Sequence, residues 1–496
     1  MVMAGHGGIC PLCASTMLVQ KTVPRIGHTL AYGYFEARET IEFCAARCHW
    51  PAGQLVTQRA PNLAQILMPQ SNFGYDVMVF VGRQRFQYAR QREEIQAAVL
   101  RKFGLTISTG ELSDLSQRFV QYLARLHHAR ADKLAAVLRA DGGWPLHVDA
   151  TGEAGRGTLL IALAGWRQWV LGAWKIPTER ADVILPCLRS IVRRFGAPCS
   201  AMRDLGKAVT PAFDTLFSEL KLTPTPPILA CHQHFVADVG KDLLEPSHAE
   251  LRDLFRRAKV RPNLRGLIRE LSRQLGPDSE AARKAVRKWQ SLGVAEHRIE
   301  GGTDGLAVVR ALAQWTLDSQ AEATGLDFPF DRPYLDLYDR CLTALRAIDA
   351  FLRTPPQDRS VRQALERLRR YLAPVDCQVP FLRVATRLRQ RAGLVDELRA
   401  VLRLTAAPPV TETVLDLEMM HEQLDQFIIS LADRRPARGP AQDLREAIDL
   451  ITSHLETHGD NLWGHVIHLP KSAGGGVRLV ARTNILCEGF LQAAQA

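Results

Sequence analysis

The sequence of 496 residues predicts an α/β protein with a mixed sheet, a large all-helical insertion and a small cysteine-rich head. Three observations predict this class. Short apolar runs alternate with helical stretches over residues 145–232, strand signals nearly vanish over 235–470, and four of the ten cysteines lie within 1–60. Alternating strand and helix patterns favour an α/β sheet, whereas apolar residues at spacings of three and four favour helices. A chain of this length is expected to hold about two to four domains.

Residues 1–60 are predicted to form a zinc-binding head. Cys10 and Cys13 form a CxxC pair, and Cys44 and Cys48 form a CxxxC pair. Two such pairs supply the four thiolates of a closed tetrahedral zinc site, and the metal would stabilise a segment with too little apolar surface to fold alone. The alternative is four unrelated buried cysteines. The two substitute ligands in this segment are His28 and His49.

Residues 72–135 are predicted to form a helical DNA-binding domain with a helix-turn-helix. Gly104 is the expected C-cap of the first helix, and Ser108 with Glu111 forms a capping box that starts the second helix. The second helix would read the major groove, which makes Ser108 and Thr109 candidate nucleic-acid contacts. An ordinary helical hairpin fits the same pattern.

Residues 141–234 are predicted to form the sheet. The order is three strands, a helix, a strand, a helix and a strand, so the first three strands form an antiparallel meander and the last two join through helical crossovers. This is the order of a ribonuclease-H-like core. After a first strand that ends near Asp149, the strands are expected at 157–165, 168–176, 198–204 and 227–232, and the helices at 180–195 and 207–220.

Three acidic residues suggest phosphoryl-transfer chemistry. Asp149 ends the first strand, Asp204 ends the fourth, and these strands are neighbours in the predicted sheet. Glu488 lies on a predicted C-terminal helix. Three such carboxylates suit two Mg²⁺ or Mn²⁺ ions about 3.5–4 Å apart, which clamp the attacking and leaving oxygens of a phosphodiester. The alternative is that both aspartates are turn residues, and Glu153 and Asp141 are rival ligands.

Two basic or titratable residues near these acids are candidate phosphate contacts. Lys207 follows Asp204, and His234 lies in the Cys-His-Gln-His segment at the end of the fifth strand. Beside the acids, His234 would contact a phosphate or orient a carboxylate. Core packing or a lone zinc half-site would explain the same segment, although no matching second half-site is evident.

A long helical insertion and a short return segment complete the chain. Leu, Ala and Arg at helical spacing predict an all-helical block over 235–470, and a return segment over 477–496 carries Glu488. Within the insertion, residues 251–300 contain 13 Lys or Arg against 6 Asp or Glu. Such a run is usually a solvated helical face, and a DNA-contacting face is the less common reading.

The charge balance favours a polyanionic partner. Lys and Arg number 63 against 52 Asp and Glu, for a net charge of +11, and neutralising phosphates releases counterions that drive such binding. No apolar run approaches the roughly 20 residues that span a bilayer, so no membrane partner is expected. Met1 to Gly8 lacks the regions of a signal peptide. A cytosolic setting with reduced cysteines is therefore expected.

The order of these motifs resembles that of DDE-type insertion-sequence transposases. The resembling parts are HVDATGE at 147–153, MRDLGKA at 202–208, the Cys-x-x-His pair Cys231 and His234, and RTNxxxEGF at 482–490. The family's last motif is of Thr-Asn-Asn-x-x-Glu type. In this chain Ile485 replaces the second Asn.

The resemblance implies a ribonuclease-H-like core that cuts and joins double-stranded DNA at the ends of a bacterial mobile element. Asp149, Asp204 and Glu488 would bind two Mg²⁺ or Mn²⁺ ions. The zinc head and the helix-turn-helix would bind the element ends, with the protein acting as a homo-oligomer on DNA in the cytoplasm, at the nucleoid. Two rival functions are an inactive transposase-derived DNA-binding protein and a ribonuclease-H-type nuclease without transposition.

The C-terminal motif departs from the family in one further respect. Only eight residues follow Glu488, whereas in the resembling family the helix that starts at this Glu continues with basic residues. About seven residues make barely two helical turns, and short helices depend on tertiary packing. We therefore expect Glu488 to point towards the aspartates but to be loosely held, with weak or absent strand transfer from a truncated copy.

Overall fold

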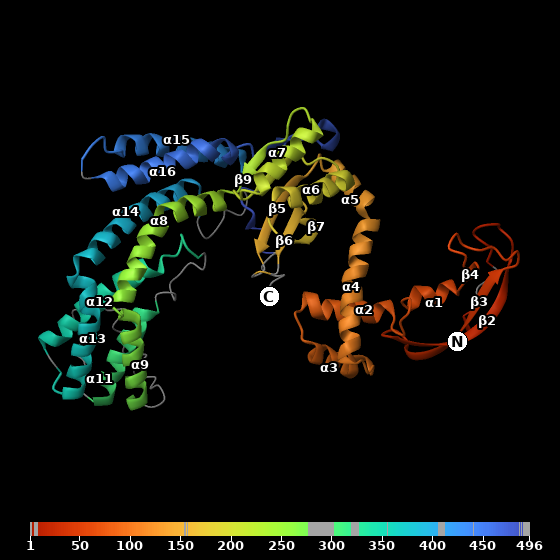
Figure 1. Ribbon diagram of the computed structural model, residues 1–496, viewed down its shortest axis with the longest axis horizontal. Coiled ribbons are helices and arrows are strands. Elements are labelled where there is room, and N and C mark those ends of the chain that lie inside the picture. Colours follow the sequence, from red (N-terminus) through yellow and green to blue (C-terminus); the bar gives the residue numbers. More distant parts are fainter. Residues whose placement is uncertain are drawn as a thin grey trace. The chain divides into compact units, whose positions relative to one another are not determined.

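The computed structural model divides into two compact units, residues 1–134 and 135–496 (Figure 1). Each unit is described by itself. The structure describes residues 2–3, 8–152, 155, 157–275, 302–318, 327–354, 356–404, 412–439, 441–485, 487 and 489.

Unit 1 begins with a long β-hairpin that the sequence did not predict. Strands β2 (Met17–Thr29) and β3 (Gly33–Cys44) pair antiparallel, and the short strands β1 (Val2–Met3) and β4 (Thr57–Gln58) pair with β3. Much of β2 is exposed and contains Pro24 and Gly27, residues that weaken a strand signal. The hairpin is stabilised on one face, where Ala37 packs in a cluster with Leu63 and other apolar residues.

The rest of unit 1 is helical and contains the predicted helix pair. Gly104 adopts φ 66° and ψ 14° at the end of α3, a left-handed conformation that glycine adopts without a Cβ penalty. Ser108 and Glu111 form the predicted capping box at the start of α4. Both boundary signals are therefore confirmed. The helices are α1 (Pro61–Ile66), α2 (Tyr75–Gly82), a π-helix (Arg83–Gln87), α3 (Arg92–Phe103) and α4 (Thr109–Ala129).

Unit 2 is organised around a five-stranded mixed sheet with strand order β7-β6-β5-β8-β9. The first three strands form an antiparallel meander, and β8 and β9 join it in parallel, as the sequence predicts. Helix α5 (Ala131–Ala140) precedes the sheet. The strands are β5 (Pro145–Gly152), β6 (Thr158–Ala164), β7 (Trp169–Ile176), β8 (Ser200–Arg203) and β9 (Ile228–Ala230).

Two crossover helices connect the parallel strands. Helix α6 (Ala181–Phe195) buries Ile184, Leu188 and Ile191 at helical spacing, and it packs against β7. Helix α7 (Val209–Leu220) packs against α6 and β8. Because each crossover returns the chain to the same end of the sheet, β5, β8 and β9 run in one direction and their C-terminal ends lie at one edge.

A large helical region follows the sheet and shares one apolar core (Figure 1). Two boundaries differ from the sequence prediction. The fifth strand ends at Ala230 and His232 already starts α8, because Cys231 caps the helix instead of extending the strand. The helices are α8 (His232–Arg257), α9 (Val260–Leu275), α11 (Gly302–Leu317), α12 (Pro333–Arg353), α13 (Arg359–Cys377), α14 (Val379–Val401), α15 (Val414–Arg434) and α16 (Gln442–His458).

The chain returns to the sheet through a small hairpin. Strands β10 (Val466–His468) and β11 (Val477–Leu479) pair antiparallel, with short 3₁₀ turns at Gly459–Leu462 and Lys471–Ala473. β10 lies within the span predicted to be all helical, so that boundary was placed a few residues too late. Three-residue strands are too short to give a clear alternating pattern.

Candidate metal centres

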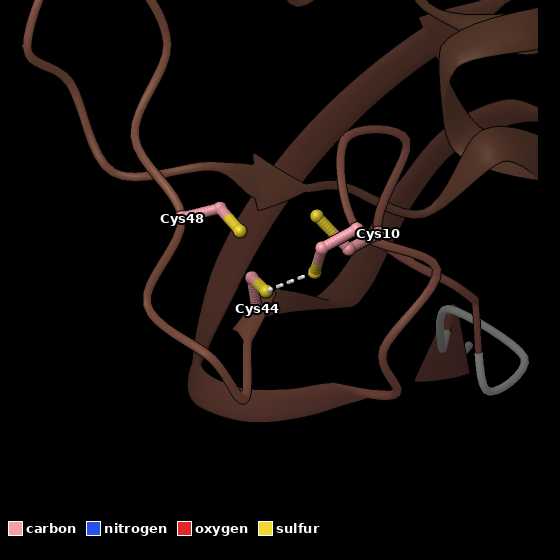
Figure 2. A group of neighbouring side chains, drawn as sticks. Cys10, Cys44 and Cys48 are labelled. Atoms are coloured by element: carbon pink, nitrogen blue, oxygen red, sulfur yellow. Dashed lines mark hydrogen bonds between the residues drawn. The ribbon is translucent and has the colours of Figure 1, made fainter.

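The four cysteines of unit 1 lie together (Figure 2). Cys44 ends β3, and a turn in which Arg47 donates its N–H to the Cys44 carbonyl brings Cys48 back towards it. A matching turn, in which Ala14 donates to the Cys10 carbonyl, carries the other pair. Two tight turns from one hairpin thus aim four sulfur atoms at one point.

The geometry of this cluster suits a tetrahedral metal ion. All four Sγ atoms lie within 4.8 Å of one another, and Cys13 Sγ lies 3.5 Å from Cys44 Sγ. Zinc–sulfur bonds of 2.3 Å place tetrahedral sulfurs about 3.8 Å apart. Cys10 and Cys44 are buried, and Met17 packs beside them. Within the described part of the chain, the set consists of the four cysteines alone, and His28 instead packs against aromatic rings.

The thiols of the cluster differ in acidity. Hydrogen bonds from the Ser15 side chain and backbone, and then from Cys48 and Cys44, lower the pKa of Cys13 to about 6. The hydrogen bond that Cys48 makes with Cys13 raises the pKa of Cys48 to about 12. Cys13 is therefore the more acidic of these two thiols. A divalent ion would displace the thiol protons, which is the chemistry expected of a cysteine-only donor set.

Asp149 and Asp204 lie just beyond the paired parts of two neighbouring strands. The parallel pairing of β5 with β8 ends at His147 and Met202, so each aspartate lies two residues after the last pair, and Asp204 directly follows β8. Asp149 is 4 % exposed, and its carboxylate accepts the N–H of Ala150 at 2.9 Å. Asp149 lies within β5, not at its end, because β5 continues to pair with β6 up to Gly152. Only its pairing with β8 stops before this point.

Other titratable residues surround this aspartate pair. His234, in the first turn of α8, is largely buried; burial lowers its pKa, but the hydrogen bond and charge of Cys231 and then the charges of Asp149 and Asp204 raise it overall, to about 10. Burial raises the pKa of Glu179, and the charge of Asp204 raises it further. Acidic side chains are therefore concentrated here, and the imidazole of His234 lies among them.

Glu179 is a member of this cluster that sequence reasoning missed. A Cβ atom on Gly206 would lie 3.0 Å from Asp204 Oδ1 and 3.3 Å from Glu179 Oε1, so glycine leaves room for both carboxylates. The available signal was position: Glu179 follows β7, which runs parallel to β5 and ends at the same edge of the sheet. Lys207, predicted to hold a phosphate, is exposed in the loop after β8.

The carboxylates do not form a closed ligand set by themselves. Among the residues that the structure describes, the four cysteines are the one group of three or more candidate ligands with atoms mutually within 4.8 Å. The predicted third acid, Glu488, and the rival Glu153 lie outside the described residues. The other rival, Asp141, forms a two-pronged ion pair with Arg167 at 2.6 Å, and this hydrogen bonding lowers its pKa.

The return segment is anchored to the sheet through Asn484. Its side-chain amide donates to the Val148 carbonyl at 2.8 Å, its carbonyl oxygen lies 3.1 Å from His147 Nδ1, and its backbone N–H points to Cys231 Sγ at 3.3 Å. Asn484 is completely buried. Three hydrogen bonds to β5 and to the residue after β9 therefore fix this segment directly beside Asp149.

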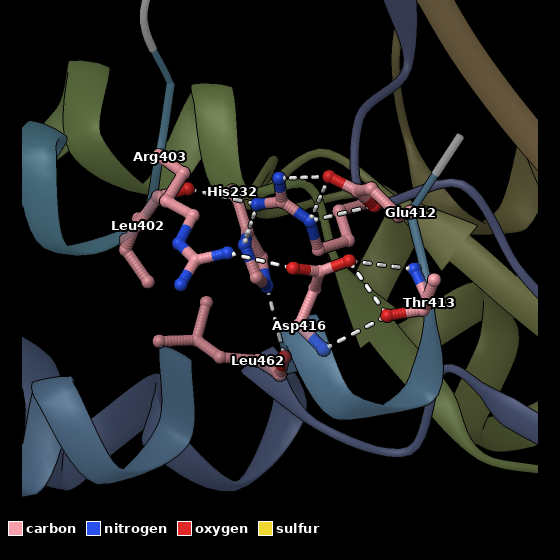
Figure 3. Close-up of polar contacts among 8 residues, drawn as sticks. His232, Leu402, Arg403, Glu412, Thr413, Asp416 and Leu462 are labelled. Atoms are coloured by element: carbon pink, nitrogen blue, oxygen red, sulfur yellow. Dashed lines mark hydrogen bonds and ion pairs between the residues drawn. The ribbon is translucent and has the colours of Figure 1, made fainter. Parts of the chain in front are cut away.

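A buried arginine fixes the same segment to the helical region. Arg482 donates to both oxygens of Glu412, to the Leu402 carbonyl at 2.8 Å and to His232 Nδ1 at 3.0 Å. His232, whose Nε2 contacts the Leu462 carbonyl at 2.8 Å, is completely buried, and this burial lowers its pKa to about 3. Figure 3 shows these partners converging, with Asp416 holding Arg403 alongside. We call this set of contacts the Arg482 clamp.

Cys487 shows which face of the sheet the return segment covers. It is buried in a cluster with Ile161 and Leu163 of β6. These two residues pair directly with Asp149 and His147, and directly paired residues point to the same face. The residue just before Glu488 therefore packs on the face that carries the Asp149 side chain.

Of the two predicted nucleic-acid contacts of unit 1, Ser108 is engaged through its side chain in the cap of α4. Ser108 Oγ accepts the Glu111 N–H and donates to the Glu111 carboxylate, and the Thr109 carbonyl accepts a hydrogen bond from Ser113. The first turns of α4 also carry Asp114 in an ion pair with Arg118. Two carboxylates at this end of the helix would be a poor match for DNA phosphates, so any groove contact there would depend on polar side chains.

No protein-family model and no curated protein matches this chain in sequence. In the described part of the chain, no helix is long and apolar enough to cross a bilayer.

Proposed function

We propose that this chain is a DNA transposase of a bacterial mobile element, with a ribonuclease-H-like core. Support comes from the strand order β7-β6-β5-β8-β9, from the position of Asp149 and Asp204 two residues after the last β5–β8 pair, and from the net charge of +11. A binding protein has no need of two carboxylates beside further acids at one sheet edge, whereas phosphoryl transfer does.

The observation that carries the proposal is the docking of the return segment on β5. Asn484 binds the backbone of the residue before Asp149, and Cys487 packs on the face that Asp149 shares. Asn484 thus lies beside the aspartate-bearing strand β5, although more than 330 sequence positions separate the two segments. Such a connection has a clear purpose if Glu488, four residues after Asn484, is the third acid of the site.

In this proposal the aspartates and Glu488 hold two Mg²⁺ or Mn²⁺ ions, for which carboxylate oxygens are suitable ligands. The ions would activate the attacking oxygen and stabilise the leaving oxygen of the phosphodiester. His234, kept cationic by its neighbours, and Lys207 would hold phosphate oxygens. The four-cysteine head would bind zinc, and unit 1 would bind the element ends as part of a homo-oligomer at the bacterial nucleoid.

The test is an assay on double-stranded DNA that carries the sequences flanking this gene. We expect Mg²⁺- or Mn²⁺-dependent nicking and joining by the full chain. The variants Asp149→Asn and Asp204→Asn should each lower the rate of nicking and joining by at least about 100-fold. Asp141→Asn is the matched control, because Asp141 pairs with Arg167 outside the site. Cutting of any DNA regardless of its ends would instead indicate a nuclease. Specific binding without cutting in either metal would indicate an inactive DNA-binding derivative.

A further inference from the structure

A basic site lies in the helical region, far along the chain from the aspartates. An open pocket of about 290 Å³ lies where α8 ends, α9 begins and α12 starts. Four arginines line it, Arg252, Arg256, Arg261 and Arg265, together with Tyr334. This pocket lies in the basic run 251–300 of the sequence, which the proposed catalytic site does not use.

Most of the arginines of this pocket have no ion pair within the described part of the chain, although they lie close together. Other arginines of the helical region are neutralised by carboxylates, as Arg367 is by Glu270 and Arg391 by Asp443. In the pocket, Asp253 pairs with Arg256 at 3.2 Å. For the remaining three, the described residues provide no carboxylate within 4.0 Å; they are Arg252, Arg261 and Arg265. Four arginines beside the single carboxylate of Asp253 leave an excess of positive charge, and an anion between them relieves their mutual repulsion.

Arg261 is held in place for such a contact. Its guanidinium lies 5.4 Å from the ring centre of Tyr334, and its Nη1 lies 3.4 Å from the Tyr334 hydroxyl. Its Nε is buried and has no hydrogen-bond partner among the described residues. A buried donor left unpaired is costly, so an acceptor group from outside would be stabilising here. Stacking on Tyr334 also reduces the side-chain entropy lost when Arg261 binds a ligand.

The chemistry of the pocket selects a phosphate group. Guanidinium groups bind phosphate oxygens through two parallel hydrogen bonds, and the N-terminus of a helix, here that of α9 at Val260, favours an anion. We propose that this pocket binds a backbone phosphate of DNA, at a distance from the phosphodiester that reacts. The choice of DNA as the source of the phosphate rests on the proposed function; the phosphate site itself does not.

The test compares two double variants of the full chain that remove equal charge. Arg252→Gln with Arg265→Gln alters the pocket through two exposed side chains, so the fold should be retained. Arg269→Gln with Arg273→Gln alters two exposed arginines of the same helix α9 outside the pocket. Affinity for double-stranded DNA is measured as a function of salt concentration. Losing one phosphate contact should lower the slope of log K against log salt by about 0.9 and weaken binding roughly tenfold at 0.1 M salt.

We expect this loss in the pocket pair and less than about twofold in the control pair. Equal losses in both pairs, or none in either, would overturn the proposal, because diffuse positive charge would then explain all binding. A single variant, Arg261→Gln, provides a second measurement, with its melting temperature recorded to confirm folding.

A parallel experiment distinguishes a DNA phosphate from a small phosphorylated molecule. It measures melting temperatures, so its result does not depend on the proposed function. Inorganic phosphate and pyrophosphate are titrated against the melting temperature of the wild-type chain and of the pocket pair. Stabilisation of the wild type alone, with unchanged DNA affinity in the pocket pair, would refute DNA as the ligand and indicate a small phosphorylated molecule. A wild-type chain that binds DNA through the pocket but never cuts it would refute the transposase and leave this site standing.

Discussion

The cysteine cluster of unit 1 and the acidic site of unit 2 are assembled over very different spans of chain. The four sulfurs come from two local pairs that one hairpin brings together, the nearest contact joining residues 31 positions apart. Asp149 lies on β5 and Asp204 directly follows β8, and the segment that docks beside Asp149 returns from 336 positions away. The first site therefore depends on one hairpin, while the second depends on the folding of all of unit 2.

This difference has a physical consequence for stability. A locally closed cluster derives its stability from the ligand bonds themselves, which in small zinc sites equal much of the folding free energy. A site assembled by long-range contacts depends on whichever contacts fix its last member. In unit 2 those contacts are the Asn484 hydrogen bonds and the Arg482 clamp. A substitution in the cysteine cluster should therefore affect that cluster alone. A substitution among the Asn484 or Arg482 contacts should destabilise unit 2 more widely.

The largest expected effect is on metal content. Cys44→Ser should reduce bound zinc from about one equivalent per chain to well below half, because a closed four-thiolate site loses one ligand. The measurement is elemental analysis of the full chain purified without chelator. Cys377→Ser, at an exposed cysteine of α13, should leave the content unchanged. A wild-type chain without zinc would contradict the metal assignment.

The next effect tests the clamp. Arg482→Ala should lower the free energy of unfolding of unit 2 by about 3–5 kcal/mol, because it leaves Glu412 and the Leu402 carbonyl without their buried partner. Zinc content should not change. Arg435→Ala removes an exposed pair with Asp449 and should cost no more than about 1 kcal/mol. Equal losses in urea unfolding would show that the clamp is an ordinary surface pair.

Acid should weaken unit 2 through its buried histidines. Burial lowers the pKa of His147 to about 4, below the ordinary value near 6.5. Because the folded pKa is the lower one, this stability is fully present above pH 6.5 and is lost as the pH falls towards 4. His147 alone should account for about 2 kcal/mol between pH 7 and pH 5. Fluorescence of buried Trp144 during unfolding reports the change, and a flat profile would argue against a neutral, buried imidazole.

The smallest effect belongs to the helix cap of unit 1. Ser108→Ala should destabilise unit 1 by about 1 kcal/mol, since the Glu111 N–H loses its acceptor. Ser108→Thr should restore most of this stability. If Ser108 also contacts DNA, the threonine variant will fold like the wild type yet bind DNA differently; matching affinities would limit Ser108 to its capping role.

Local sequence patterns predict much of this architecture. The spacing of Cys10, Cys13, Cys44 and Cys48 predicted their meeting, because each pair is close in sequence and needs only one hairpin. Gly104 and Ser108 marked helix boundaries through backbone chemistry that acts within a few residues. The alternation of strands and helices predicted the strand order, since crossovers between parallel strands allow few arrangements.

Other features depend on contacts that no local pattern encodes. Glu179 joins the acids only because β7 runs parallel to β5 in the finished sheet. The roles of Arg482 and Glu412 follow from packing between segments 70 positions apart. The β2–β3 hairpin was missed because its exposed residues gave no clear alternation of apolar and polar positions. The placement of Glu488 remains a prediction.

The clamp also determines how separable the helical region is from the rest of unit 2. The backbone N–H of His232, where that region begins, donates to the Arg482 carbonyl at 3.0 Å, so its entry and exit touch although they are 250 positions apart. A domain inserted between two adjacent points can be lengthened, exchanged or shortened without straining its host. Extra residues within the helical region would therefore leave the path of the sheet unaltered, whereas any replacement of the region would have to supply the acceptors that Glu412 and Leu402 provide for Arg482.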